Sequence, residues 1–412
     1  MRKIGTPAAT TLQAIELCCG LGGISLGLRE LGFGIQRAYD SWDKAVRIYN
    51  HNSSDPIASV CDLLSREGRQ KVADDFRRDG EIELLAAGPP CQGFSILRNG
   101  RNNVDNPHNK VLAAMPDYVA LFRPRLVLIE NVPTLAFHQG GTTLRSVLER
   151  LESPGPRGLR YRVGYEVYDT ALFGVPQTRR RILILAVRHG SGKEHLPSPG
   201  PDLRPLYTAL RHGGAMPAEL SSFVGMLKDP EDFSLTSARQ ALSDLPELGE
   251  AQHEEPRLYR SEPASAFQRL MRGAGQPLVS GTRTPEIRAE TRSRLRHIKP
   301  GGCARHIPAK YLNGLSRRFG SAYRRLHPDV PSTALSTKYD CVYHYEHERS
   351  LSVREYARLQ GIPDHIDFPE SLVCRRSAYE MIGNAVPPLL IQGVLGSVLS
   401  LDGKKFIPAG GW

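Results

Sequence analysis

The sequence predicts an α/β fold in which a doubly wound, mostly parallel sheet is covered by helices. Over the first 190 residues, short apolar runs alternate with stretches of helical spacing, which is the pattern of repeated strand–helix units. A glycine-rich turn follows the first apolar run, and such turns join a strand to a helix at the carboxyl edge of these sheets. A chain of 412 residues is long enough for two or three folded units.

The elements of the predicted sheet domain follow from these runs. The expected strands are Gln13–Leu17, Ile35–Tyr39, Ile82–Ala87, Leu126–Glu130 and Arg181–Val187. Helical spacing appears at Asp117–Leu121, Leu144–Leu151 and Ser237–Leu245. The stretch Gly190–Leu206 is rich in Gly, Pro and Ser, which predicts a linker.

The positive charge of the chain is concentrated in one segment. The net charge is +11, but Arg257–Arg325 alone holds 16 Lys and Arg against three acids, so this segment carries +13 and the remainder about −2. Tyr and Phe side chains lie among these arginines, which suits contacts with phosphates and base edges. A nucleic-acid-binding lobe is the favoured interpretation, and a solvated basic face is the alternative.

Composition excludes several other classes. We expect neither a signal peptide nor a transmembrane helix, because the N-terminus has no apolar core and no uninterrupted apolar run approaches 18 residues. The expected location is the cytoplasm. The seven cysteines show no framework spacing and no C-x-x-C pair, so we expect neither a disulfide scaffold nor structural zinc.

The glycine turn predicts a nucleoside ligand. Cys19-Gly20-Leu21-Gly22-Gly23 lies between a strand and a helix, where a ligand can approach the backbone closely. Ser25 occupies the position of the third glycine in a dinucleotide site, which disfavours a nicotinamide enzyme. Asp40, Trp42 and Asp62 follow the next strands and suit ribose hydroxyls, an adenine ring and an adenine amino group. For each residue taken alone, an ordinary helix-capping aspartate or core tryptophan is the favoured interpretation. Together with the glycine turn, these residues favour an adenosine ligand.

The segment Leu84–Ser95 contains the candidate nucleophile. An apolar strand runs into Gly-Pro-Pro, a rigid turn that holds Cys91 at the crevice and not in the core. A lone cysteine is more often buried and inert, but a thiol in this position can acquire thiolate character. Glu130, at the end of another apolar strand, is a candidate for proton handling, with a helix cap as the alternative.

Arginines alternate at the start of the last predicted strand. Arg179 and Arg181 are two residues apart, so on one continuous strand they share a face and could hold an anion or a base carbonyl. The alternative is an exposed basic strand edge.

Taken in order, these motifs resemble those of the DNA cytosine-5 methyltransferase family, in its bacterial modification type. The matching strings are Pro-Pro-Cys-Gln at 89–92, Glu-Asn-Val at 130–132, Gln-x-Arg-x-Arg at 177–181, Arg354-Glu355, Arg-Leu-Gln-Gly-Ile-Pro at 358–363 and Gly-Asn-Ala-Val-Pro-Pro at 383–388. The linker and the basic lobe are the parts that do not match.

The resemblance implies a Rossmann-like S-adenosylmethionine-dependent methyltransferase fold with a smaller inserted target-recognition domain. Residues 1–245 would be catalytic, with a linker at about 190–235. Residues 246–335 would form the basic target-recognition domain, and 336–412 would return to the catalytic domain. The final motif would then pack against the glycine turn. The implied reaction transfers a methyl group to C5 of a flipped-out cytosine in a specific duplex sequence, through a covalent bond between Cys91 and C6.

Residue roles follow from the same resemblance. Cys91 corresponds to the nucleophile, Glu130 to the residue that holds N3 and the amino group of cytosine, Arg181 to the arginine near O2, and Arg179 to its companion. The implied cofactor-binding residues are Leu17, Cys18, Gly20, Gly22, Gly23, Asp40, Trp42, Asp62, Pro90, Asn384, Ala385 and Val386. The implied DNA contacts are Ser95, Arg98, Arg101, Arg317, Arg318, Arg324 and Arg325. The stretch Leu97–Pro107 resembles the loop that closes over the base.

The chain departs from the family pattern in places. Glu16-Leu17-Cys18 replaces the usual Asp-Leu-Phe, which removes an adenine-stacking ring, and Ser41 stands where a ribose-binding glutamate is usual. Asn106 and His108 replace Asp and Arg.

The resemblance also implies the product and the partners. S-adenosylhomocysteine is the implied product, and no metal is expected. The implied partners are duplex DNA and a cognate restriction endonuclease, and the enzyme is expected to be a monomer. The alternatives are an RNA (tRNA) cytosine-5 methyltransferase and a catalytically silent DNA-binding homologue. Methylation of an amino group is disfavoured, because that chemistry normally uses an Asp or Asn before the two prolines and an aromatic residue after them. Here Gly88 and Cys91 occupy those two positions.

Overall fold

The computed structural model describes residues 12–79, 82–90, 107–155, 158–190, 235–248, 255–273, 277–312 and 323–400. The chain divides into two compact units. Unit 1 comprises Met1–Asp169, Arg180–Gly200 and Val386–Trp412, and unit 2 comprises Thr170–Arg179 and Pro201–Ala385. The chain therefore passes between the units at Asp169, Arg179, Gly200 and Ala385.

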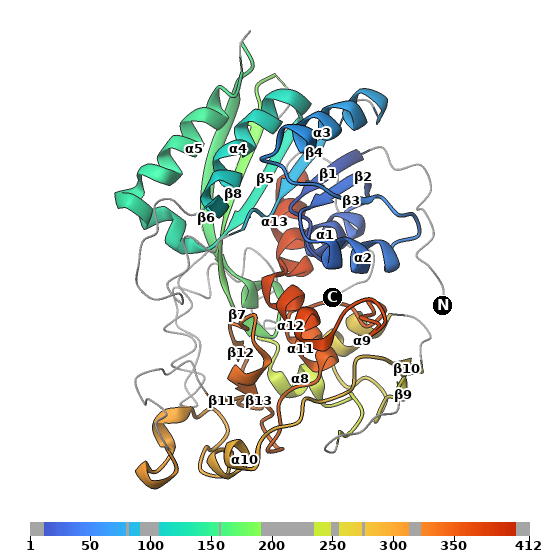
Figure 1. Cartoon of the computed structure of the whole chain (residues 1–412), viewed down its shortest axis with the longest axis vertical. Coiled ribbons are helices and arrows are strands. Elements are labelled where there is room, and N and C mark those ends of the chain that lie inside the picture. The colour runs from blue at the N-terminus through green and yellow to red at the C-terminus, as the bar shows by residue number, and fades with distance from the viewer. Residues whose placement is uncertain are drawn as a thin grey trace. The chain divides into compact units, whose positions relative to one another are not determined.

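Unit 1 is built on a mixed sheet whose described strands have the order β3-β2-β1-β4-β5-β8-β6 (Figure 1). Strands β3, β2, β1, β4 and β5 are parallel, and β8 runs antiparallel to both β5 and β6. The strands are β1 (Leu12–Leu17), β2 (Phe33–Asp40), β3 (Ala58–Val60), β4 (Leu84–Ala87), β5 (Leu126–Asn131), β6 (Tyr161–Asp169) and β8 (Arg180–Arg188). The mostly parallel α/β fold is confirmed.

All five expected strands are present, but β3 and β6 were not predicted. Strand β3 has only three residues, and along β6 the burial is mixed, with Arg162 and Tyr165 exposed, so neither shows a continuous apolar run. The strand expected at Arg181–Val187 is antiparallel to its neighbours, a direction that the apolar pattern does not reveal.

Helices cover both faces of this sheet. They are α1 (Gly23–Glu30), α2 (Asp43–His51), α3 (Arg66–Asp79), α4 (Pro107–Phe122), η1 (Pro133–Gly141), α5 (Thr142–Glu152) and α13 (Pro388–Ser400). Alternate strand residues separate the two faces. Tyr39 packs in the cluster that contains side chains of α3, α4 and α5, whereas its neighbour Ala38 packs against α2. The stretches expected to be helical at Asp117–Leu121 and Leu144–Leu151 lie in α4 and α5.

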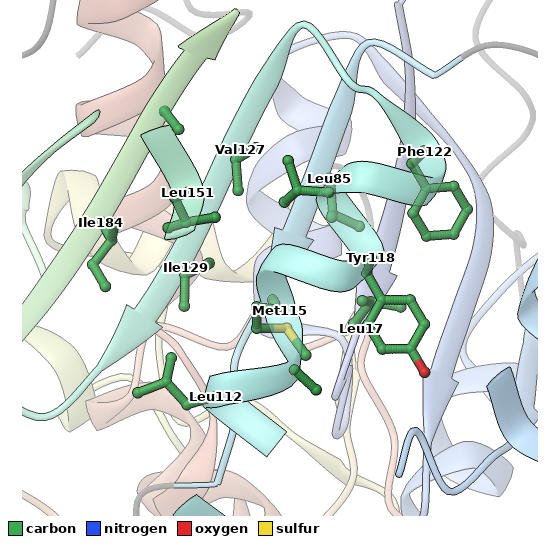
Figure 2. Close-up of a cluster of buried hydrophobic side chains, with 14 of the residues drawn as sticks. Leu17, Leu85, Leu112, Met115, Tyr118, Phe122, Val127, Ile129, Leu151 and Ile184 are labelled. Atoms are coloured by element: carbon green, nitrogen blue, oxygen red, sulfur yellow. The ribbon is translucent and has the colours of Figure 1, made fainter. Parts of the chain in front are cut away.

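The larger core cluster forms between the sheet and α4. Figure 2 shows Met115 and Tyr118 of this helix over the strands that carry Leu85 and Val127, and all four side chains are almost fully buried. Burying a leucine or phenylalanine side chain stabilises a fold by about 1.5–3 kcal/mol. This packing holds the parallel strands in register, so that their carboxyl ends form a level edge.

The C-terminal segment returns to unit 1 and packs against α1. A Cβ atom on Gly23 would lie 2.2 Å from the carbonyl oxygen of Val386, and one on Gly27 would lie 2.6 Å from that of Pro388. Only glycine permits backbones to approach so closely. The expected packing of the final motif against the glycine turn is confirmed for Val386, which lies against Gly23, whereas Pro388 lies against Gly27 of α1.

The described part of unit 2 consists of short elements. Its helices are η2 (Thr170–Phe173), α8 (Ala238–Leu242), α9 (Ala266–Arg272), α10 (Ala289–Leu295), η4 (Ala304–His306), η5 (Ala309–Tyr311), η6 (Tyr339–Cys341), α11 (Val353–Leu359) and α12 (Arg375–Asn384). Its strands are β7 (Gln177–Thr178), β9 (Arg257–Leu258), β10 (Leu278–Val279), β11 (Arg324–Arg325), β12 (Ser332–Thr333) and β13 (Val342–Tyr343). Helix α8 lies within the stretch expected to be helical at Ser237–Leu245.

Buried ion pairs hold the centre of unit 2. The guanidinium of Arg358 donates to both carboxylate oxygens of Asp244 and of Asp364, and all three side chains are almost fully buried. Burial of these charges is tolerated because each is paired and hydrogen-bonded. The string at 358–363 is therefore part of the core of unit 2.

The observed division differs from the expected domain boundaries. The return was expected at residue 336, but residues up to Ala385 belong to unit 2 and the return begins at Val386. The short segment Thr170–Arg179 also belongs to unit 2, because β7 pairs with β12. The role of residues 246–335 in target recognition stays a prediction.

One described stretch, Arg375–Leu399, is long and apolar enough to cross a membrane by length and composition. However, 67% of its apolar window is buried within the protein, and the helix is interrupted at Ala385, whose backbone is extended. These features are those of core helices.

Candidate active site

Several turns leave the sheet of unit 1 at one edge. Leu17 is in register with Tyr39 of β2 and with Ala87 of β4, and Ala87 is in register with Ile129 of β5. The carboxyl ends of β2, β1, β4 and β5 therefore lie level. In doubly wound sheets this edge is where ligands bind.

The glycine turn connects β1 to α1 through three left-handed residues. Cys18, Gly20 and Gly22 have φ angles of 56°, 54° and 91°. A Cβ atom on Gly22 would lie 2.8 Å from the ring of Tyr49, so no side chain fits there. At Gly20, by contrast, no atom of the described residues lies within 4 Å of the Cβ position. The backbone at Gly20 is thus open to a ligand.

Asp40 fixes this turn to the end of β2. Its carboxylate accepts hydrogen bonds from the backbone N–H groups of Gly20 and Trp42, each at 2.8 Å. Burial raises the pKa of Asp40, and the backbone donors oppose that shift. The carboxylate keeps further lone pairs for a ribose hydroxyl, but its observed partners are the two turns.

Other residues expected to bind the cofactor lie around the same edge. Trp42 is half-buried at the N-terminus of α2, and Asp62 is exposed just after β3. Val386 lies against Gly23, as described above, whereas Asn384 and Ala385 belong to unit 2. An open glycine backbone, a half-buried indole ring and an exposed carboxylate are groups that fit an adenosine ligand.

A buried carboxyl group beneath the turn was not predicted. Oε2 of Glu16 accepts hydrogen bonds from the backbone N–H and the hydroxyl of Ser25, and the Tyr49 hydroxyl donates to Ser25 Oγ at 2.7 Å. Burial raises the pKa of Glu16 to about 8, although Ser25 opposes the shift. Ser25 therefore replaces the third glycine of a dinucleotide site with a polar anchor inside α1. An acid within an apolar strand was the available signal.

Glu130 and Arg181 form an ion pair at the other end of this edge. Nε of Arg181 lies 2.8 Å from Oε1 of Glu130, and the side chains are only 14% and 10% exposed. Shielding from water strengthens the Coulomb attraction within the pair, and the desolvation of the two charges offsets part of that gain. It joins a potential base-holding carboxylate to a fixed positive charge.

Asn131 connects this pair to the Gly-Pro-Pro turn. Its Nδ2 donates to the carbonyl of Pro89 at 3.2 Å, and its Oδ1 accepts from the N–H of Val132 at 2.9 Å. Pro90, half-buried, is the last residue described before Cys91. Cys91, Ser95, Arg98 and Arg101 lie outside the described residues, as do Arg317 and Arg318. The string Glu-Asn-Val drew attention to Asn131, but only the structure shows this positioning contact.

Comparison with known proteins identifies the chain. A family model for C-5 cytosine-specific DNA methylases matches residues 12–400. The chain belongs to this family. It is 30% identical to the type II methyltransferase M.AgeI of Thalassovita gelatinovora, over 92% of this chain and 97% of that protein. It is 26% identical to M1.HphI of Haemophilus parahaemolyticus, over 95% and 88% of the two chains. It is therefore a DNA cytosine-5 methyltransferase.

Solved structures show the same fold. The crystal structure of Dnmt2 from S. pombe matches with a TM-score of 0.54 at 18% identity, over 96% of this chain and 99% of that one. At this identity the match supports the fold of the methylase and nothing finer. Within the part of the methylase that the structure describes, no group of three or more His, Cys, Asp or Glu residues could hold a metal ion.

Arg179 and Arg181 were expected to share one face of a continuous strand. The structure of the methylase does not bear this out. Arg179 lies between β7 and β8 and belongs to unit 2, where its guanidinium donates to the carbonyls of Leu335 at 3.1 Å and Gly383 at 2.6 Å. Its residue exposure is 3%. Because the strand is interrupted at this point, the period-two argument fails. In this geometry the guanidinium of Arg179 is engaged within unit 2, and its role in the reaction stays a prediction.

Arg325 is also engaged within the protein. Its Nε, Nη1 and Nη2 atoms donate to the carbonyls of His344 at 3.2 Å, Ile298 at 2.9 Å and Glu346 at 2.9 Å, respectively. Desolvation lowers its pKa. The expected DNA contact of Arg325 is therefore not supported by this geometry, in which the side chain joins three segments of unit 2.

Proposed function

We propose that this methyltransferase acts on a cytosine flipped out of a specific duplex sequence, through a covalent bond between Cys91 and C6 of the base. The observation that carries the proposal is the buried Glu130–Arg181 pair, because it lies beside the turn that leads directly into Cys91. A shielded carboxylate and guanidinium can hold a polar base edge in fixed orientation.

The cofactor in this proposal is S-adenosylmethionine, which supplies an electrophilic methyl group on a sulfonium and leaves as S-adenosylhomocysteine. The open backbone at Gly20 accepts the close approach of the ligand. Trp42 offers a ring for adenine and Asp62 a carboxylate for a polar group of the nucleoside. Cys18, whose thiol is held neutral by a pKa raised through burial, adds no charge there.

The chain's own groups then supply the nucleophile and the charge stabilisation. The thiolate of Cys91 adds to C6, which places electron density on C5. Glu130 holds N3 and the amino group and so favours the protonated ring, while Arg181 balances the charge of Glu130 and faces O2. After C5 takes the methyl group, loss of its proton expels Cys91 and regenerates the thiolate. No metal is included, since thiolate and sulfonium already provide nucleophile and electrophile.

Unit 2 is proposed to read the DNA. Its segment 257–325 carries the +13 charge, which favours a polyanionic partner. A base inside a duplex is unreachable to Cys91, so flipping must precede chemistry at a cost of a few kcal/mol. We further propose that the enzyme works as a cytoplasmic monomer beside a restriction endonuclease of the same specificity.

The test is bisulfite sequencing of DNA from a methylation-free bacterial host that expresses the chain. We expect methylated cytosines confined to one short sequence, and their complete loss in Cys91→Ser. Cys374→Ser is the matched control, because it removes an exposed thiol of unit 2 and should leave methylation intact. Residual methylation by Cys91→Ser would overturn the covalent mechanism. Unmodified DNA together with methylated tRNA would overturn the DNA assignment in favour of an RNA substrate.

A further inference from the structure

Unit 2 contains a positively lined hollow, and one of the residues that line it, Arg324, is among the expected DNA contacts. Its volume is about 250 Å³, several times the roughly 30 Å³ occupied by a water molecule in the liquid. The lining includes Gly301, Gly302, Arg305, Arg324, His327 and Thr333. None of the described residues that line it is acidic. The hollow therefore favours an anion.

The walls of the hollow are tied together by backbone hydrogen bonds. The N–H of Gly301 donates to the carbonyls of Arg325 and Leu326, both at 3.0 Å, and the N–H of Arg325 donates to the carbonyl of Gly302 at 3.0 Å. Gly301 has a φ of 79°, and a Cβ there would lie 3.1 Å from the ring of His327. The shape thus exists before a ligand binds, and preorganisation reduces the entropy cost of binding.

Residues that carry hydrogen-bond donors line this preformed shape. Arg305 is exposed and Arg324 is half-buried at the start of β11. His327 accepts a hydrogen bond from the N–H of Asp329 at Nδ1, 3.2 Å away, so the neutral ring carries its proton on Nε2. Thr333 adds a hydroxyl. Two guanidinium groups, an imidazole N–H and a hydroxyl suit the oxygens of a phosphate.

The concave shape distinguishes between the two parts of duplex DNA that such donors could contact. Phosphates project along the ridges of the double helix, whereas base edges lie at the floor of the grooves and are reached by projecting side chains or helices. A hollow fits a projecting group. We propose that this hollow binds one backbone phosphate of the DNA and so sets the register of unit 2 on the duplex without reading sequence. This inference rests on the proposed role of unit 2 in DNA binding.

The test measures binding of the full-length protein to two fluorescent duplexes, one with the methylated sequence and one scrambled, from about 50 to 200 mM salt. For Arg324→Ala we expect roughly tenfold weaker binding to both duplexes, the fold-change of a lost charge-assisted hydrogen bond. The plot of log affinity against log salt should flatten by roughly 0.9, the value for one phosphate. Arg324→Ala should still methylate the same DNA sequence as the wild type.

Arg375→Ala is the control, because it removes an equal charge from unit 2 at a position that does not line the hollow. Nε of Arg375 lies 3.3 Å from Oε1 of Glu370. We expect little change in either measure, and Arg324→Lys should recover most of the salt slope. Loss confined to the methylated duplex would overturn phosphate binding in favour of base readout. If Arg324→Ala binds as the wild type does, and the wild type binds and methylates DNA, phosphate binding in the hollow is refuted but the proposed function is not. A wild type that neither binds nor methylates DNA would refute the proposed function as well.

Discussion

The ion pair between Glu130 and Arg181 exists because β8 runs against the direction of β5. Glu130 is in register with Leu183 and Asn131 with Ile182, so the first residues of β8 lie beside the last residues of β5. Had β8 been parallel, Arg181 would lie at the opposite edge of the sheet. The antiparallel strand thus delivers a guanidinium to the edge where the parallel strands deliver their turns.

The first prediction concerns this carboxylate. We expect Glu130→Gln to slow turnover by roughly 100-fold or more while DNA affinity changes little, because the amide keeps the shape but not the charge that favours the protonated base. Single-turnover rates at saturating DNA and cofactor measure this directly. A near-normal rate would remove Glu130 from the chemistry.

The partner arginine permits a double-mutant cycle. Arg181→Ala leaves the buried carboxylate without its guanidinium, so we expect it also to slow turnover strongly. The combined Glu130→Gln, Arg181→Ala variant should be less impaired than the product of the single effects, with coupling of about 0.5–3 kcal/mol. Independent, multiplicative effects would contradict a shared function.

The second prediction concerns the pH dependence of stability. Glu16 has a pKa of about 8 in the folded protein and about 4.5 when unfolded, so its stabilising effect is complete below pH 4.5 and is lost as pH rises to about 8. In Glu16→Gln the decline across that window should be shallower by up to about 1.4 kcal/mol per pH unit. Urea unfolding at several pH values measures it, and parallel curves for both proteins would show that Glu16 is ionised in the fold.

The third prediction tests the seat of the C-terminal segment. Gly23→Ala places a methyl group 2.2 Å from the carbonyl oxygen of Val386, so we expect a loss of about 1–3 kcal/mol in unfolding free energy and weaker cofactor binding. Gly88→Ala is the matched control, because its nearest neighbour lies at 3.6 Å. Equal unfolding free energies for the two variants would contradict this packing.

The fourth prediction separates two adjacent arginines. Arg325→Ala leaves the carbonyls of Ile298, His344 and Glu346 without their donor, so we expect a loss of about 2 kcal/mol in unfolding free energy. Arg324→Ala keeps all three of these hydrogen bonds, so we expect a smaller loss of unfolding free energy than for Arg325→Ala. If both variants unfold alike, Arg325 does not join the segments as described.

Local patterns were sufficient for much of the sheet and its turns. Apolar runs located β1, β4, β5 and β8, because strands buried on both faces contain little else. Strand β2 was also located, although its burial is mixed. The glycine turn and the Gly-Pro-Pro turn were found from backbone requirements that are local to the chain. Strand β6 escaped because its exposed positions break the pattern.

Long-range partners were beyond such patterns. Several side chains donate hydrogen bonds to backbone carbonyls that lie far away in the sequence, namely those of Arg179, Arg325 and Asn131. A carbonyl is present at every residue, so nothing in the sequence marks which one an arginine will meet. The boundary at Val386 was missed for a related reason, since it depends on which unit each segment packs against.

The sequence by itself determined the fold class, the order of the motifs and the residue types available for chemistry, because each depends on properties of neighbouring residues. Only the tertiary structure decided the direction of β8, the pairing of Arg181 with Glu130, and the engagement of Arg179 and Arg325 within unit 2. The strand direction and these side-chain contacts depend on which segments of the chain pack against one another. The free energy that stabilises this packing comes from the whole core and not from neighbouring residues.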